Sequence, residues 1–227
     1  MHEIAPGIHT WTAPHPEYRP RAEEVVSYAL RGADALALVD PLLPADARRR
    51  REVLEALDAL AEGARRVELL VTIPYHTRSA EELLLRHAAS RPARLWGHAN
   101  VRRRLADPGL LTEVPWTRPG EAVAVADGLA LAYTIGRPRR SERPYLFPAL
   151  RAVVFGDAVV GVADGVRFWN QSTGTGAAWY RDVFAPTLAP LAAQDVERVL
   201  VTHGPPVLQD GRRALAACLA APPVQMY

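Results

Sequence analysis

Two groups of short apolar segments, which follow one another in the same order, constrain the fold of this chain most strongly. The first half runs from strand-like patterns within residues 7–40 to an amphipathic helical pattern at 45–61, and then alternates strand and helix. The second half runs from strand-like patterns within 121–157 to a helix at 177–194, followed by one more strand and a last helix. Because such alternation is typical of a sheet covered by helices, the sequence predicts an α/β fold.

Three features mark the expected breaks in this pattern. Residues 107–120 are rich in proline and predict a loop, and residues 161–176 combine glycine with polar side chains and predict a second, longer loop. Pro186 and Pro190 are expected to interrupt the helix at 177–194, since proline lacks the backbone N–H of a helix interior. Long ordered loops often carry function, so the second loop is of interest.

Length and hydropathy predict one soluble domain that spans residues 1–227. With 49% apolar residues the chain can form a sizeable core, and no apolar run approaches the ~18 residues of a membrane span. The first residues lack a basic region followed by an apolar stretch and a cleavage site, so we expect a cytoplasmic protein that does not contact membranes.

The basic residues, 27 in number, are all arginine. The absence of lysine excludes a Schiff-base lysine, a P-loop lysine and a lysine general base. Because the net charge is only +2, we interpret the runs at 48–51 and 102–104 as solvated helix faces and predict no nucleic-acid binding. Cys218 lies in an apolar helical pattern and is expected to be buried and inert.

Four of the apolar strands end in residues that can carry chemistry. They end at Asp40, at residues 75–78, at Asp157 and at His203. Ligands of α/β proteins gather where strands end and loops begin, so these positions are the first candidates for a site.

The succession LVDP, LLVT with a polar loop and a helix, a strand ending in Gly-Asp, and LVTHG resembles the metallo-β-lactamase superfamily over almost the whole chain. The resemblance implies a four-layer αββα sandwich, with a metal site at one edge. In that family the loop after LLVT reads His-x-His-x-Asp-His and binds one or two zinc ions.

The ligand positions of that motif hold other residues here. Ile73 and Tyr75 stand where the first two histidines would be, Thr77 replaces the aspartate, and Arg78 replaces the last histidine. A further histidine of the family aligns with Arg137. The resemblance therefore implies a degenerate metal site and a protein that is a pseudoenzyme.

Asp157 and His203 are retained from the metal set, and Asp40 is retained as the aspartate behind it, where it braces the loops. Zinc sites need three or four protein ligands, so a metal would require His76 as a third ligand beside Asp157 and His203. The alternative for His203 is a hydrogen-bonded structural residue. For His76 it is an exposed loop histidine.

Without a metal, Asp157 would hold uncompensated negative charge, which is costly to bury. We therefore expect Arg78, Arg137 or both to pair with Asp157 in place of the metal. The alternative is that both arginines lie on an exposed rim.

The second loop offers an aromatic wall and amide groups at residues 168–171, which suit a small polar or aromatic ligand at a pocket mouth. Alternatively, Trp169 fills the core. Gly174, Thr175 and Gly176 precede a helix and could present N–H groups to an anion, although they match no phosphate-binding motif.

Three functions remain open from the sequence. The first is a metal-free protein that binds a small anionic ligand, with the candidate residues Tyr75, His76, Arg78, Arg137, Asp157, Trp169 and His203. The second is a hydrolase of esters or lactones that retains one weakly held zinc. The third is an interaction protein with an exposed apolar patch. General acid–base catalysis without a metal also stays open, and the oligomeric state is not predicted.

Overall fold

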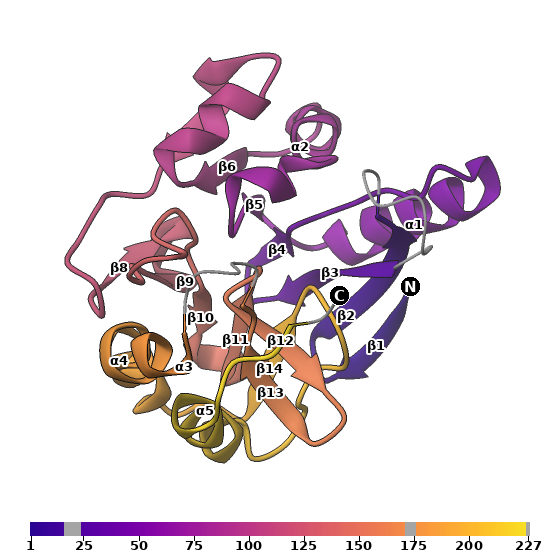
Figure 1. Cartoon of the computed structure of the whole chain (residues 1–227). Helices are drawn as coiled ribbons and strands as arrows, with labels where there is room; N and C mark the ends of the chain where they lie inside the picture. The colour runs from indigo at the N-terminus through magenta and orange to yellow at the C-terminus, as the bar shows by residue number, and fades with distance from the viewer. Residues whose placement is uncertain (16–23, 171–175, 226–227) are drawn as a thin grey trace. The chain divides into compact units, whose positions relative to one another are not determined.

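The computed structural model describes residues 1–15, 24–170 and 176–225, and it divides into two compact units, Met1–Glu113 and Val114–Tyr227. Each unit has its own main sheet and its own apolar core (Figure 1). None of the helices in these three ranges is both long and apolar enough to cross a membrane.

The first unit contains a seven-stranded sheet whose strands lie in sequence order. Neighbours from β1 to β4 are antiparallel, and those from β4 to β7 are parallel. The bounds are β1 His2–Ala5, β2 Ile8–Pro14, β3 Glu24–Arg31, β4 Ala35–Val39, β5 Arg66–Leu70, β6 Ala93–Gly97 and β7 Leu111–Glu113. Strand β7 lies inside the segment 107–120 that was predicted to be a loop. Its three residues are too few to give a period-two pattern, so that prediction was wrong there.

Helices α1 (Ala47–Ala61) and α2 (Ala80–Ala88) connect the parallel strands of this sheet. Asp46 caps α1 by accepting a hydrogen bond from the Arg49 backbone, and the apolar side of α1 packs into the core of the unit. The remaining connections include the 3-10 helices η2 (Pro74–Thr77), η3 (Ala99–Arg104) and η4 (Pro108–Leu110).

The second unit contains a five-stranded sheet in the order β14-β11-β10-β9-β8. Only β11 and β14 are parallel, and their register pairs Phe155 with Val201. The bounds are β8 Ala122–Val125, β9 Ala130–Tyr133, β10 Tyr145–Phe147, β11 Ala152–Phe155 and β14 Arg198–Val201, with 3-10 helices η5 Ala126–Gly128 and η6 Pro148–Leu150 between them. The parallel pair brings two candidate residues to the same sheet edge.

The segment predicted as a long loop at 161–176 instead begins with a hairpin. Strands β12 (Val159–Val162) and β13 (Gly165–Phe168) pair in antiparallel fashion. Gly165 has a backbone φ of +137°, which a side chain would not tolerate well, so the Asp-Gly step marks the turn. The glycine content that indicated a loop is the requirement of this hairpin.

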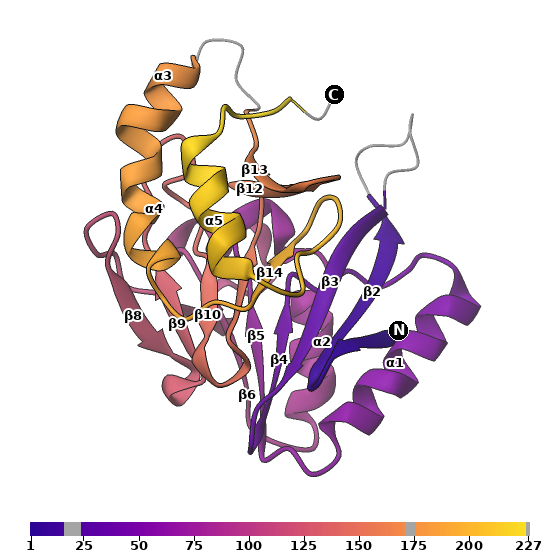
Figure 2. The same cartoon turned by 90° about the horizontal axis from the view of Figure 1, so that it is seen from below.

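The prolines do not interrupt the helical segment where they were expected to. Residues 177–192 are helical throughout, as α3 (Ala177–Trp179), a π-helical turn η7 (Tyr180–Phe184) and α4 (Ala185–Ala192). Pro186 lies in the first turn of α4, where the missing N–H costs little. Helix α5 (Gly211–Ala220) lies beside α4 and contributes Cys218 to the core, so the prediction of a buried cysteine is confirmed (Figure 2).

Candidate functional site

The second unit brings Asp157 and His203 together. Each residue lies two positions beyond the end of a strand, and those strands are the parallel neighbours β11 and β14. The Asp157 Oδ1 and His203 Nε2 atoms are 3.4 Å apart, and both residues are buried. The register of one strand pair therefore produces a carboxylate–imidazole contact from residues 46 positions apart in the sequence.

The backbone that carries Asp157 is held by a buried acid that the sequence analysis did not identify. The Glu142 carboxylate accepts hydrogen bonds from the backbone N–H groups of Gly156 (2.9 Å) and Asp157 (3.1 Å). Glu142 is fully buried. Nothing in its local pattern indicates this role, because the two residues that it holds are 14 and 15 positions away.

His203 is positioned by an unusually close approach of two glycines. Its carbonyl oxygen accepts a hydrogen bond from the Gly161 N–H at 2.8 Å. A Cβ atom at Gly204, whose φ is +80°, would come within 2.2 Å of the Gly161 carbonyl oxygen, and one at Gly161 would meet the Pro205 backbone at 2.1 Å. Both positions therefore require glycine.

Trp169 and Arg139 complete this cluster, which we call the strand-end cluster: Arg139, Asp157, Trp169 and His203. The rings of Trp169 and His203 are 4.9 Å apart, centroid to centroid, and the Arg139 guanidinium lies 5.8 Å from the Trp169 ring centre. Arg139 Nη1 is 4.0 Å from Asp157 Oδ2. Trp169 is 8% exposed, so it is largely a core residue as well as a wall of the cluster.

Tyr180 lies against the same cluster. Its hydroxyl donates to the Trp169 carbonyl oxygen at 3.3 Å. Burial raises the pKa of Tyr180, while the nearby charge of Arg139 acts in the opposite direction. Tyr180 is therefore a neutral hydrogen-bond donor at physiological pH.

The arginine that faces Asp157 within this unit is not the one that the sequence indicated. Arg137 is exposed, whereas Arg139, two residues further along the same turn, approaches the carboxylate. The remaining parts of the expected loop site divide: Phe168 is in the core, while Gln171, Gly174 and Thr175 lie outside the described residues.

The first unit forms a second carboxylate–imidazole pair. His76 Nδ1 is 2.9 Å from Asp40 Oδ2, and Asp40 also accepts hydrogen bonds from the backbone N–H and the hydroxyl of Thr72. The sequence alternative of an exposed His76 was wrong, since the residue is 3% exposed. The short helix η2 turns the side chain back toward the end of β4, a contact that the spacing of the residues does not reveal.

Arg78 and Tyr75 lie on the same turn but have other contacts. Arg78 Nη1 donates to the Asp40 carbonyl oxygen at 3.3 Å, and its backbone φ is +42°. Tyr75 is 64% exposed and carries the Arg104 guanidinium 4.6 Å from its ring centre. Of the predicted residues, the first unit thus pairs only His76 with a buried acid.

Both carboxylate–imidazole pairs have a recognisable chemistry. A carboxylate on one ring nitrogen of a histidine fixes its orientation and raises its basicity. Such a histidine can accept or donate a proton, bind a metal, or donate to an anion, depending on what reaches its other nitrogen.

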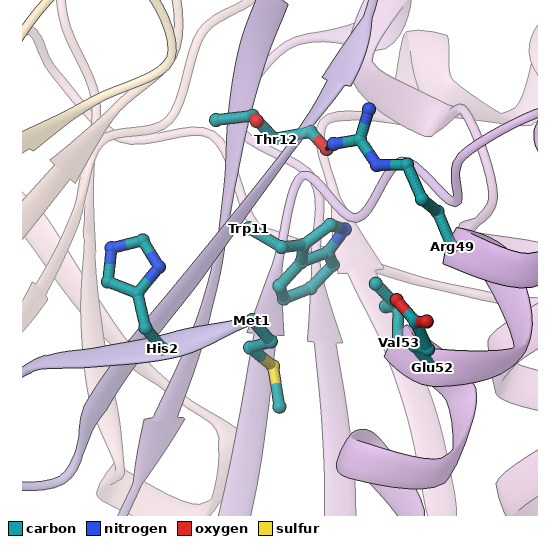
Figure 3. Close-up of a pocket in the computed structure, with 7 residues that line it drawn as sticks. All are labelled: Met1, His2, Trp11, Thr12, Arg49, Glu52 and Val53. Atoms are coloured by element: carbon teal, nitrogen blue, oxygen red, sulfur yellow. Dashed lines mark hydrogen bonds between the residues drawn. The ribbon is translucent and has the colours of Figure 1, made fainter.

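Hollows elsewhere in the first unit do not include the predicted residues. In Figure 3 Trp11 lies between the first two residues of the chain and the α1 side chains Arg49, Glu52 and Val53, in a hollow of about 200 Å³. A second hollow, of about 390 Å³, lies at the ends of α1 and α2 beside His87. The exposed large apolar side chains in the described ranges come from separate segments and are Met1, Tyr75, Leu85, Trp116 and Val183.

Comparison with known proteins identifies the fold. No family model and no curated protein matches the chain. A solved metallo-β-lactamase from Erythrobacter litoralis, with β-mercaptoethanol in its active site, is 16% identical with a TM-score of 0.66, and 96% of this chain matches 95% of that one. The mono-zinc form of FIM-1, a metallo-β-lactamase from Pseudomonas aeruginosa, is 15% identical with a TM-score of 0.61 (96% and 93% covered).

A metallo-β-lactamase family protein from Thermus thermophilus is 19% identical with a TM-score of 0.57, and 96% of this chain matches 80% of that one. Together these likenesses show that the chain has the metallo-β-lactamase fold, and the predicted fold class is confirmed. At these identities they show the fold alone.

Proposed function

We propose that the chain binds a small anionic ligand at the strand-end cluster without a resident metal. The observation that carries this proposal is the position of Arg139, whose guanidinium lies 4.0 Å from the Asp157 carboxylate. Both side chains are 11% exposed, so water screens their interaction only weakly.

The electrostatic argument starts from Asp157. A buried carboxylate needs a compensating positive charge, and in a metal-binding member of this fold that charge would come from the ion. Here a guanidinium lies close enough to supply it. A divalent ion placed on Asp157 would also be repelled by the Arg139 charge, which lowers the affinity of the cluster for metals.

The other members of the cluster suit a ligand with a flat or apolar body and a polar end. His203 contributes ring nitrogens beside the indole of Trp169, and aromatic walls with a few placed polar groups are typical of small-molecule sites. The Tyr180 hydroxyl adds one neutral donor close by. We expect recognition by hydrogen bonds and stacking, with no bond broken in the ligand.

A hydrolase of esters or lactones with one metal is the second candidate, and one distance favours it. Two ligands bound at about 2.0–2.1 Å in a tetrahedral zinc site lie roughly 3.3 Å apart. The measured 3.4 Å between Asp157 Oδ1 and His203 Nε2 fits that spacing. The Asp40–His76 pair likewise fits the carboxylate that commonly supports a metal-binding histidine.

In this second candidate the metal would be held by Asp157 and His203, with His76 as the third ligand that the sequence analysis predicts. A bound divalent ion would supply Lewis-acid activation of a carbonyl group. Asp40 would hold the ring of His76 in one orientation and keep its Nδ1 occupied.

Elemental analysis distinguishes the two candidates. The protein is purified without chelator or added metal and measured as isolated, after incubation with zinc, and as the Asp157→Ala variant. Asp182→Ala, which removes an exposed acid paired with Arg181, is the matched control. Absence of metal from every sample supports the metal-free binder. Near-stoichiometric metal that is lost in Asp157→Ala and kept in Asp182→Ala would overturn it and direct the next assays to esters and lactones.

A further inference from the structure

A second buried guanidinium, that of Arg143, lies outside the strand-end cluster and is held in a fixed orientation. Arg143 is fully buried. Its Nη1 donates to the backbone carbonyl oxygens of Arg140 (2.9 Å) and Glu142 (2.8 Å). Two backbone acceptors on one nitrogen fix the plane of the guanidinium and leave its opposite edge to be accounted for.

That opposite edge consists of Nε and Nη2, and neither atom has a hydrogen-bond partner among the residues that the structure describes. Burying charged donors without partners is costly, so native proteins rarely retain them without a reason. Nε and Nη2 also form one of the edges with which arginine binds a carboxylate or a phosphate through two parallel hydrogen bonds.

Trp116 covers this guanidinium from one face. The ring centre of Trp116 is 5.2 Å from the Arg143 guanidinium carbon, which is within the range of a cation–π contact. Trp116 is nevertheless 57% exposed and stands in an irregular segment between β7 and β8, next to Pro115. An exposed side chain of this kind can rotate away and open a path to the guanidinium beneath it.

The charges of the neighbouring acids leave this role to Arg143. Arg139 faces Asp157, and the carboxylate of Glu142 accepts two backbone N–H groups. Arg143 directly follows Glu142 in the chain, so it belongs to the turn that supports the Asp157 backbone. Burial lowers the pKa of Arg143, and the pairing of its guanidinium with an oxyanion would offset that cost.

We propose that Arg143 is the anchor for the acidic group of the ligand, a carboxylate or phosphate that its Nε and Nη2 bind in bidentate fashion when Trp116 moves aside. The inference rests on the proposed function, because it identifies the cation that recognises the ligand's charge. It assigns to Arg139 the neutralisation of Asp157 and to Arg143 the binding of the anion.

The test is equilibrium dialysis of the full chain with inorganic phosphate and, separately, with acetate. We expect one bound anion, at least tenfold weaker binding in Arg143→Lys, which keeps the charge but loses the planar edge, and binding within twofold of wild type in Arg140→Gln. The Arg140 side chain is exposed, and its backbone carbonyl is unchanged in that variant. Preference for phosphate or for acetate identifies the acidic group.

Trp116→Ala tests the cover without touching the anchor, and it decides the question even if Arg143→Lys fails to fold. We expect at least fivefold faster association of the preferred anion by stopped flow, with Trp116→Phe close to wild type. An unchanged rate would overturn the inference. So would wild-type affinity in Arg143→Lys, or no binding of either anion to the wild type.

Arg139→Gln separates a failure of this inference from a failure of the proposed function. Loss of anion binding in Arg139→Gln with full binding in Arg143→Lys would show that Arg139 is the anchor, which overturns the inference and leaves the metal-free binder standing. Stoichiometric metal in the wild type would overturn the proposed function itself.

Discussion

Replacing Arg139 by glutamine is the most informative perturbation of the strand-end cluster, because it removes the charge that we place opposite Asp157. The separation of 4.0 Å corresponds to about 4 kcal/mol at an effective dielectric constant near 20. Removing one partner of a buried ion pair costs roughly 3–5 kcal/mol in measured cases. We therefore expect Arg139→Gln to lower the free energy of unfolding by about 3 kcal/mol.

The same variant should bind zinc more tightly. Removing one positive charge near a divalent ion relieves a repulsion of at least about 3 kcal/mol, which corresponds to roughly a hundredfold in the dissociation constant. Zinc should then restore part of the lost stability, because a ligand that binds only the folded state stabilises it.

The measurement is a double-mutant cycle of Arg139→Gln and Asp157→Asn by urea unfolding, with and without zinc. We expect a coupling energy of about 2–3 kcal/mol, since residues in one buried ion pair are not additive. The exposed ion pair of Arg181 and Asp182 provides the control cycle, with an expected coupling below about 1 kcal/mol. A coupling below about 0.5 kcal/mol for Arg139 and Asp157 would refute the view that the guanidinium compensates the carboxylate.

Three further predictions concern the supporting structure. Gly204→Ala should cost more than about 4 kcal/mol or prevent folding, whereas Gly128→Ala, at a similar φ of +82° but in open space, should cost only about 1–2 kcal/mol in urea unfolding. Burial lowers the pKa of His87 below its usual 6.5, so the stability from keeping it neutral is full above pH 6.5 and is lost as the pH falls toward the folded-state pKa. Unfolding measured from about pH 5 to 8 should show this loss, and His87→Gln should remove it. Burial raises the pKa of Cys218 to about 12, so a thiol reagent should label it only after unfolding, and rapid labelling of the folded chain would contradict this.

The strand ends were predictable from the sequence because they depend on local signals. The runs that end at Asp40, Asp157 and His203 are apolar and short, and each is followed by a residue type that does not continue a strand. The structure places each of these residues just beyond a strand of its unit's main sheet. The fold class followed from the same signals.

The contacts within the site were not predictable, because they depend on loop geometry over long sequence separations. Arg137 and Arg139 are equally plausible partners of Asp157 in the sequence, and only the path of the turn exposes one and buries the other. Glu142 looks like a surface acid until its two backbone donors are seen. An exposed His76 stayed open as an alternative because η2, which turns its side chain back onto Asp40, has no strong sequence signal.

The two units reach a similar local solution by the same physical route. In each, a parallel strand pair ends in an aspartate and a histidine, with Asp40 beside His76 in one and Asp157 beside His203 in the other. Parallel strands bring their ends to one sheet edge whatever binds there, so the strand geometry places the acids and imidazoles without reference to a metal. What distinguishes a metal site from a metal-free one is then the cation that balances Asp157, and that choice depends on the turn that carries Arg139 rather than on the sheet.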